Sequence, residues 1–169
     1  MITSDSKSAK WAPECGRLMP TSTKPLNLVI MYQNNPGCLE YAQSLDSMFG
    51  GRARQFNTTY VRMQIVPINT SKDESPLWIK ALESLVPVFN KVRSVRSVPA
   101  VLCITSTVTI DVYASVLRYC AENGVAEQFA VVETQTGGGR KKGVPMPIMA
   151  SNLWMALQCK IGGTLWSVD

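Results

Sequence analysis

The run Pro99-Ala100-Val101-Leu102-Cys103-Ile104 (PAVLCI) is apolar throughout. A run of this kind is typical of a strand in the centre of a parallel sheet that helices cover on both faces. From about Asp111 to Glu122 the residues follow a helical pattern, and Asn123-Gly124 supplies the stop that such a helix needs. A further strand pattern runs from Gln128 to Val132. We therefore predict a strand, a helix and a second strand over this part of the chain.

The same alternation extends towards the N-terminus. A strand is predicted over 26–31, which is a short apolar run, and another over 60–68, where Arg62 and Gln64 lie on the polar side of an alternating pattern. Asn34-Asn35-Pro36-Gly37 has the composition of a turn. The helix that follows it is expected to end at Gly50-Gly51.

Two more helices complete the pattern. Ser75-Pro76 is a favourable helix start, and Pro87 is expected to kink or shorten that helix. Its apolar face is expected to comprise Trp78, Leu82, Leu85, Val86 and Phe89. The last helix is predicted over 147–160. Strand and helix thus alternate four times, which indicates an α/β, Rossmann-like fold with a mostly parallel four-stranded sheet flanked by helices.

The chain divides into three parts by composition. Residues 1–24 are polar, contain two prolines and show no periodic pattern, so we expect a poorly ordered lead-in segment. Residues 25–163 carry the alternating pattern and form the expected domain. After Gly162-Gly163, residues 164–169 begin to alternate like a strand, which predicts that the chain is a piece of a larger protein.

The composition excludes several classes of protein. The sequence has no histidine, which removes Ser-His and Cys-His nucleophile systems, and its five cysteines are scattered without a C-x-x-C pair. We therefore expect no zinc site and a reduced, cytoplasmic location, with the nucleus as the alternative. No apolar run approaches the roughly 20 residues that span a bilayer, and we expect no secretory signal and no membrane partner. The net charge of +5 is compatible with a polyanionic partner.

The basic loop Gly137-Gly138-Gly139-Arg140-Lys141-Lys142-Gly143 does not fit the spacing of a phosphate-binding P-loop or of a dinucleotide fingerprint. Two interpretations stay open. The loop contacts a nucleic-acid backbone, or it is a solvated and variable loop, which is the favoured interpretation.

Taken in order, several segments resemble the MID domain of Argonaute proteins, and more specifically the Piwi branch. The C-terminal block Cys159-Lys160-Ile161-Gly162-Gly163, continued by Leu165-Trp166 and Val168-Asp169, is the most specific part. Looser matches are found at 101–105, at Asp111-Val112-Tyr113, at Arg118-Tyr119-Cys120 and at Gln128. The resemblance covers about residues 16 to 169, and residues 164–169 would then be the first residues of a PIWI domain.

The resemblance implies a pocket for the 5′-phosphate and first base of a guide RNA. It assigns Tyr113, Gln128 and Lys160 to that pocket, while Leu117 occupies the place of a second basic residue. Arg118, one position further on, or Lys141 or Lys142 would have to compensate, or a Mg²⁺ ion would accompany the phosphate. The loop from Thr105 to Asp111 matches the segment that inspects the first base.

These implications lead to one expected function and two alternatives. The chain is expected to be a non-catalytic module that anchors a single-stranded, 5′-phosphorylated guide RNA in RNA silencing, together with the rest of an Argonaute or Piwi protein. Slicer residues would belong to the PIWI domain, so no catalytic residue is assigned. The alternatives are a Rossmann-like enzyme or small-molecule-binding domain, and a degenerate Piwi fragment that binds nothing.

Overall fold

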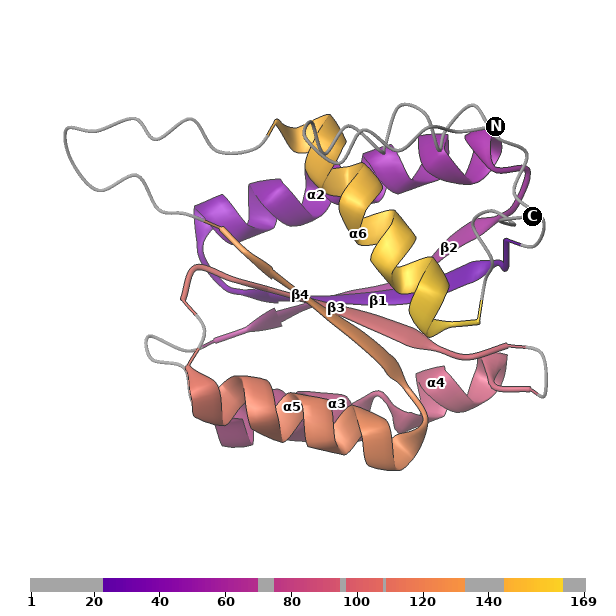
Figure 1. Ribbon diagram of the computed structural model, residues 1–169. Coiled ribbons are helices and arrows are strands. Elements are labelled where there is room, and N and C mark those ends of the chain that lie inside the picture. The colour runs from indigo at the N-terminus through magenta and orange to yellow at the C-terminus, as the bar shows by residue number, and fades with distance from the viewer. Residues whose placement is uncertain (1–22, 70–74, 95–96, 108, 133–144, 163–169) are drawn as a thin grey trace, which may run out of the picture.

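The computed structural model describes residues 23–69, 75–94, 97–107, 109–132 and 145–162. Four strands and five helices lie in these ranges (Figure 1). In chain order they are β1 (Leu26–Gln33), α2 (Pro36–Gln55), β2 (Tyr60–Ile68), α3 (Ser75–Ser84), α4 (Val86–Val92), β3 (Ala100–Thr105), α5 (Ile110–Asn123), β4 (Ala126–Val131) and α6 (Met146–Lys160).

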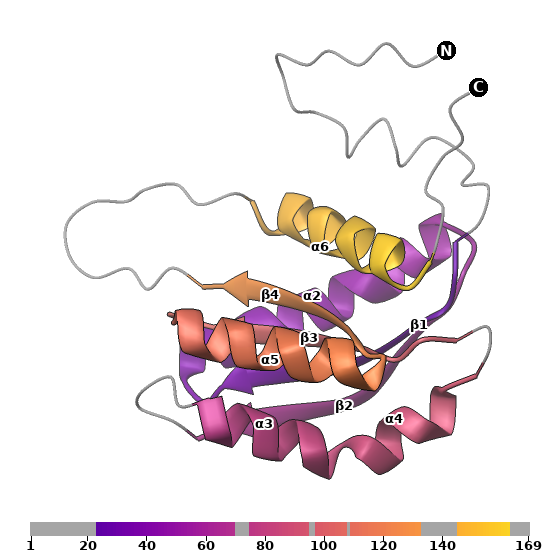
Figure 2. The ribbon, with the colours of Figure 1, turned by 60° about the horizontal axis from the view of Figure 1, so that its bottom comes forward.

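The four strands form one sheet in the order β2-β1-β3-β4, and every neighbouring pair is parallel. Helices α2 and α6 cover one face, while α3, α4 and α5 cover the other, so the molecule has three layers (Figure 2). The predicted α/β, Rossmann-like class is therefore confirmed. Because β3 lies between β1 and β4, its six residues are all buried, as the apolar run at 99–104 predicted.

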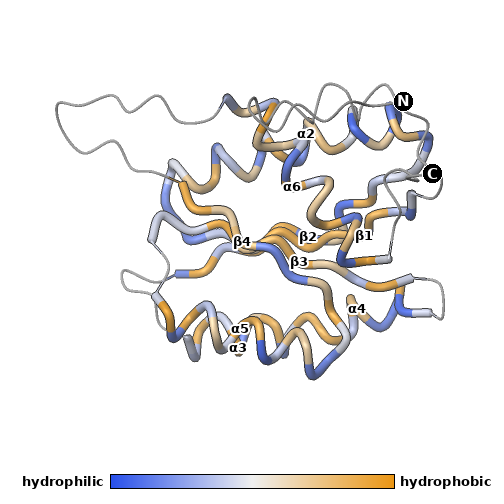
Figure 3. Tube along the Cα trace, in the orientation of Figure 1, coloured by the Kyte–Doolittle hydropathy of each residue, from blue (hydrophilic) through white to orange (hydrophobic). Residues whose placement is uncertain are grey.

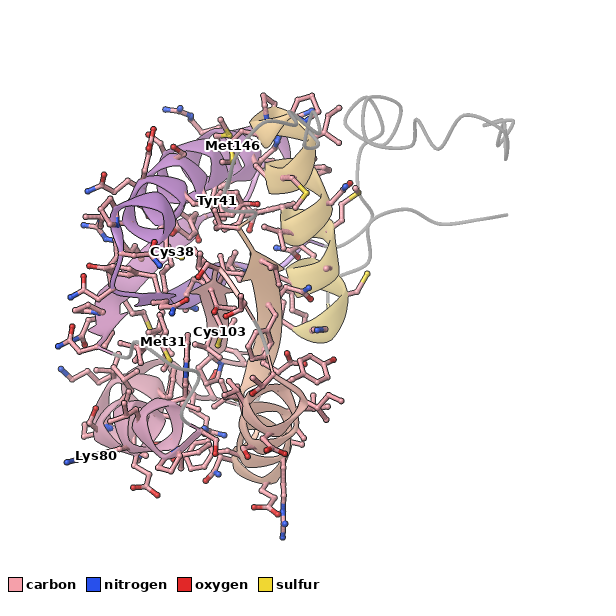
Figure 4. The ribbon with its side chains drawn as sticks, turned by 90° about the vertical axis from the view of Figure 1, so that its left-hand side faces the viewer. Met31, Cys38, Tyr41, Lys80, Cys103 and Met146 are labelled. Carbon is pink, nitrogen blue, oxygen red and sulfur yellow. The ribbon has the colours of Figure 1, made fainter. Side chains whose placement is uncertain are left out.

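Two hydrophobic clusters hold the layers together, one on each face of the sheet. Apolar residues are concentrated on the strands and on parts of the helices that cover them (Figure 3). The cluster beneath α2 and α6 includes Phe49 and Trp154, whose ring centroids are 6.0 Å apart. The opposite cluster contains Met31 and Cys103, which lie between the sheet and its lower helices in Figure 4. Burial of both clusters supplies the main driving force for the three-layer arrangement.

Helix α2 is longer than the sequence predicted. The expected stop at Gly50-Gly51 is wrong, because the helix continues to Gln55 and ends at Phe56. Burial of Phe49 and Ala53 on the same face holds the helix together across the two glycines. At its start, Asn35 caps the helix and Pro36 is the first helical residue, so the expected turn is confined to Asn34-Asn35, and Pro36-Gly37 begin α2.

The helix after β2 divides at Leu85 into α3 and α4, as Pro87 predicted. Trp78, Leu82, Leu85 and Phe89 are buried, as expected. Val86 is 39% exposed, so its assignment to the apolar face is wrong. Val86 is the first residue of α4, directly after the break at Leu85.

A buried glutamine fixes the chain where it enters β1. Gln158 of α6 is fully buried, and its Oε1 accepts from Lys24 N at 3.0 Å. Its Nε2 donates to Lys24 O at 2.8 Å. The predicted lead-in segment 1–24 lies outside the described residues except for Thr23 and Lys24, and the predicted start of a strand at 164–169 lies wholly outside them.

Within the described ranges, no helix is long and apolar enough to cross a membrane.

Candidate nucleic-acid interface at the edge of strand β4

Lys160, the last residue of α6, reaches strand β4. Its Nζ donates to Glu127 O at 2.6 Å, to Gln128 Oε1 at 2.8 Å and to Glu127 Oε1 at 3.3 Å. Gln128 and Lys160 are 32 residues apart in the chain. The structure thus brings together two of the residues that the resemblance assigned to one pocket.

Strand β4 lies at the edge of the sheet, so alternate backbone groups point away from β3. Ala126 N donates to Pro99 O, and Val132 N donates to Thr105 O. The backbone N–H and C=O groups of the even-numbered residues of β4 therefore point towards β3, and those of the odd-numbered residues point outwards. The outward carbonyl of Glu127 accepts from Lys160, and that of Phe129 accepts from Gln128 Nε2 at 3.3 Å. Both candidate residues therefore also cover the edge strand, a role that unpaired edges require.

Tyr113 lies on the other side of β4. Its ring packs on Phe129 with centroids 5.2 Å apart, and 44% of the residue is exposed. Consecutive side chains of a strand point to opposite faces, so Phe129 faces α5 while Gln128 faces α6. A ligand that touches Tyr113, Gln128 and Lys160 together must therefore lie along the outer edge of β4.

Arg118 does not join this group in the structure. Its Nε donates to Glu122 Oε1 at 2.9 Å, one turn further along α5, and its side chain is 81% exposed. With about 100° of rotation per residue, Arg118 is about 140° around the helix from Tyr113. Lys141 and Lys142, the other candidates for a second cation, lie outside the described residues.

The side of α5 next to β4 is apolar. Ile110, Tyr113 and Leu117 follow at helical spacing and are each more than a third exposed. Val131, at the end of β4, is exposed as well. Leu117 thus extends an apolar surface beside Tyr113, at the position where the resemblance leads us to expect a basic residue.

Three hydroxyls at the end of β3 and in the loop after it are engaged within the protein. Thr105 Oγ1 and Ser106 Oγ donate to Gln33 Oε1 at 3.1 and 2.8 Å, and Thr109 Oγ1 accepts from Val112 N as the cap of α5. The prediction that this loop inspects a base therefore has to rely on other groups of the loop, including its backbone. Gln33 was not predicted, because a glutamine at the end of an apolar strand carries no distinctive pattern.

Glu127 is the main residue of the site that the sequence reasoning missed. Its side chain is 10% exposed and its carboxylate forms an ion pair with Lys160. The formal charges of the pair cancel. A signal was present, since Glu127 is the only charged residue in the strand AEQFAV.

The two cysteines near Glu127 are held in the thiol form by burial. Burial and the Glu127 carboxylate raise the pKa of Cys120 to about 12, and burial raises the pKa of Cys103 well above its usual value. Buried thiols that stay protonated are neither nucleophiles nor metal ligands at neutral pH.

Among the described residues, no group of three or more His, Cys, Asp or Glu side chains could hold a metal ion. Glu127 alone does not suit a Mg²⁺ ion, since its carboxylate is bound to Lys160.

No known family model matches the chain, and no curated protein sequence matches it.

Proposed function

We propose that the chain anchors the 5′ end of a small single-stranded RNA at the outer edge of β4, in the manner of an Argonaute or Piwi MID domain. The observation that supports this is the 2.8 Å contact between Lys160 Nζ and Gln128 Oε1. The resemblance assigns both residues to one phosphate pocket. They lie in different elements, Lys160 in α6 and Gln128 in β4, so regular secondary structure alone does not bring them together.

In this proposal the two sides of β4 have different roles. Lys160 and Gln128 donate to the terminal phosphate on the α6 side. The exposed ring of Tyr113 stacks with the first base on the α5 side, where Leu117 widens the apolar surface. Stacking on an aromatic ring is tolerant of base identity, which agrees with a loop after β3 whose described hydroxyls are mostly engaged within the protein.

The proposal assigns no catalytic step to this chain. Its partners would be the guide RNA and the remainder of an Argonaute or Piwi protein, in the cytoplasm or the nucleus. A turnover screen with nucleotide substrates addresses the enzyme alternative, and a titration with a mononucleotide monophosphate addresses the degenerate fragment.

The substitution Lys160→Ala tests the phosphate role. We expect it to weaken binding of a 5′-phosphorylated RNA by about tenfold, because a charge-assisted hydrogen bond is lost. Binding of the same RNA with a 5′-hydroxyl should change little. Fluorescence anisotropy with both RNAs measures the two dissociation constants.

Lys91→Ala is the matched control, since it removes the same charge from an exposed position on α4. It should lower both affinities slightly and equally. Equal losses for the two RNAs in Lys160→Ala would refute the phosphate role. Absence of binding to either RNA by the unsubstituted chain would refute the proposed function as a whole.

A further inference from the structure

We propose that Glu127 sets the selectivity of this site by competing with the terminal phosphate for Lys160. The inference rests on the proposed function, and it names a residue that limits the affinity for phosphorylated ends.

A lysine ammonium has three N–H donors and no acceptor. In the structure Lys160 Nζ has three oxygen acceptors within 3.3 Å, namely Glu127 O, Gln128 Oε1 and Glu127 Oε1. All three donors are therefore engaged before any ligand arrives. A phosphate oxygen can bind Lys160 only by displacing one of these acceptors.

The carboxylate is the acceptor that a phosphate displaces. Its contact is the longest of the three, at 3.3 Å against 2.6 and 2.8 Å. Glu127 O belongs to the backbone of β4 and cannot turn away. The carboxylate and the phosphate also carry charge of the same sign, so they disfavour each other beside one ammonium.

Displacement has an energetic cost that limits phosphate binding. The Glu127 side chain is only 10% exposed, and a buried carboxylate without its cation is unfavourable. Binding a phosphate thus exchanges one ion pair for another instead of adding one. Removing the charge of Glu127 while keeping its shape should therefore increase the affinity of the site for a terminal phosphate.

The substitution Glu127→Gln tests this inference. We expect it to raise the affinity for a 5′-phosphorylated RNA by about tenfold, because Lys160 then meets the phosphate without a competing anion. The affinity for the 5′-hydroxyl RNA should stay within about twofold. The quantity to measure is the ratio of the two dissociation constants, which a purely structural role of Glu127 would not change.

Glu122→Gln is the matched control. It adds the same net charge by removing the partner of Arg118 on the exposed side of α5. An equal change of the ratio in both variants, or no change in Glu127→Gln, would overturn the inference. The gain must also disappear in Lys160→Ala/Glu127→Gln.

Glu127→Met is a second variant in case the amide destabilises the fold, since methionine suits the buried surroundings of Cys103 and Cys120. It should change the ratio in the same direction. If Lys160→Ala weakens phosphate binding but neither Glu127 variant strengthens it, the proposed function stands and this inference falls. If neither the unsubstituted chain nor any variant binds RNA, the proposed function and this inference are both refuted.

Discussion

Gln158 is the clearest case of a polar side chain whose burial depends on a complete set of partners. Its amide satisfies both backbone groups of Lys24, which is 134 residues away. Hydrogen bonds of this type contribute little in net terms, but an unsatisfied buried group is costly. The two hydrogen bonds therefore hold the start of β1 against the end of α6, because breaking them would leave buried polar groups unsatisfied.

The substitution Gln158→Leu should lower the free energy of unfolding by about 1–3 kcal/mol, because the N–H and C=O of Lys24 lose their partners. Urea unfolding measured by circular dichroism gives the value. Gln43→Leu, on the exposed surface of α2, is the matched control and should change stability by less than about 0.5 kcal/mol. Similar losses in both variants would contradict the role of the Lys24 contact.

At the level of helices, α2 carries a built-in weakness. Gly50 and Gly51 lie inside the helix, and a Cβ added at either position would meet nothing within 4 Å. The glycines are therefore not required for packing. They weaken a helix whose stability depends on the buried residues on either side of them.

Replacing both glycines by alanine should stabilise the protein by about 1–2 kcal/mol, because each change removes a helix-interior glycine. Thermal and urea unfolding check the gain. Gly124→Ala is the contrasting variant. Its φ of +64° is left-handed, so an alanine there should destabilise the protein by about 1–2 kcal/mol. A loss of stability in the α2 variant would show that the glycines have a role outside the helix.

The two edge strands of the sheet are covered by different means. Strand β2 carries an irregularity opposite Leu28 and Val29, the exposed charge of Arg62, and Pro67, which lacks an N–H. Strand β4 depends on Lys160 and Gln128. The edge at β2 is therefore protected by its own sequence, and the edge at β4 by its own Gln128 together with Lys160 of helix α6.

For the whole molecule, several groups that titrate at alkaline pH are held protonated. Burial raises the pKa of Cys38, Cys103 and Cys120, and burial together with the hydrogen bond to Asp46 raises the pKa of Tyr60. In the unfolded chain, thiols ionise near pH 8.5 and tyrosines near pH 10. The unfolded chain therefore releases protons first, and stability present below about pH 8.5 is lost as the pH rises.

We expect the free energy of unfolding to fall by a few kcal/mol between pH 7 and pH 10, since each retained proton contributes about 1.4 kcal/mol per pH unit. Urea unfolding under reducing conditions at several pH values measures the slope. Cys120→Ala should be less stable at pH 7 but should show a smaller slope. A free energy that stays constant up to pH 10 would contradict this account.

The sequence predicted the fold well, whereas the candidate site stays a prediction of which the structure contains one expected contact, that of Gln128 with Lys160. Apolar runs such as that of β3 report burial directly, and Gly124 ended α5 as expected. The two glycines at 50 and 51 led to a wrong helix end, because their low helix propensity is outweighed by the burial of Phe49 and Ala53. The pairing of Lys160 with Glu127 depends on where α6 crosses the edge of the sheet. No spacing in the chain encodes that crossing.

The placement of Lys160 has a consequence for handling the protein. When its ammonium is removed by substitution, the outward carbonyl of Glu127 loses its donor, on an edge strand that also carries the exposed Val131. Such a rim invites self-association, since a second chain can add its own strand there. The solubility of the protein and its binding of a phosphate would then both depend on the ammonium group of Lys160.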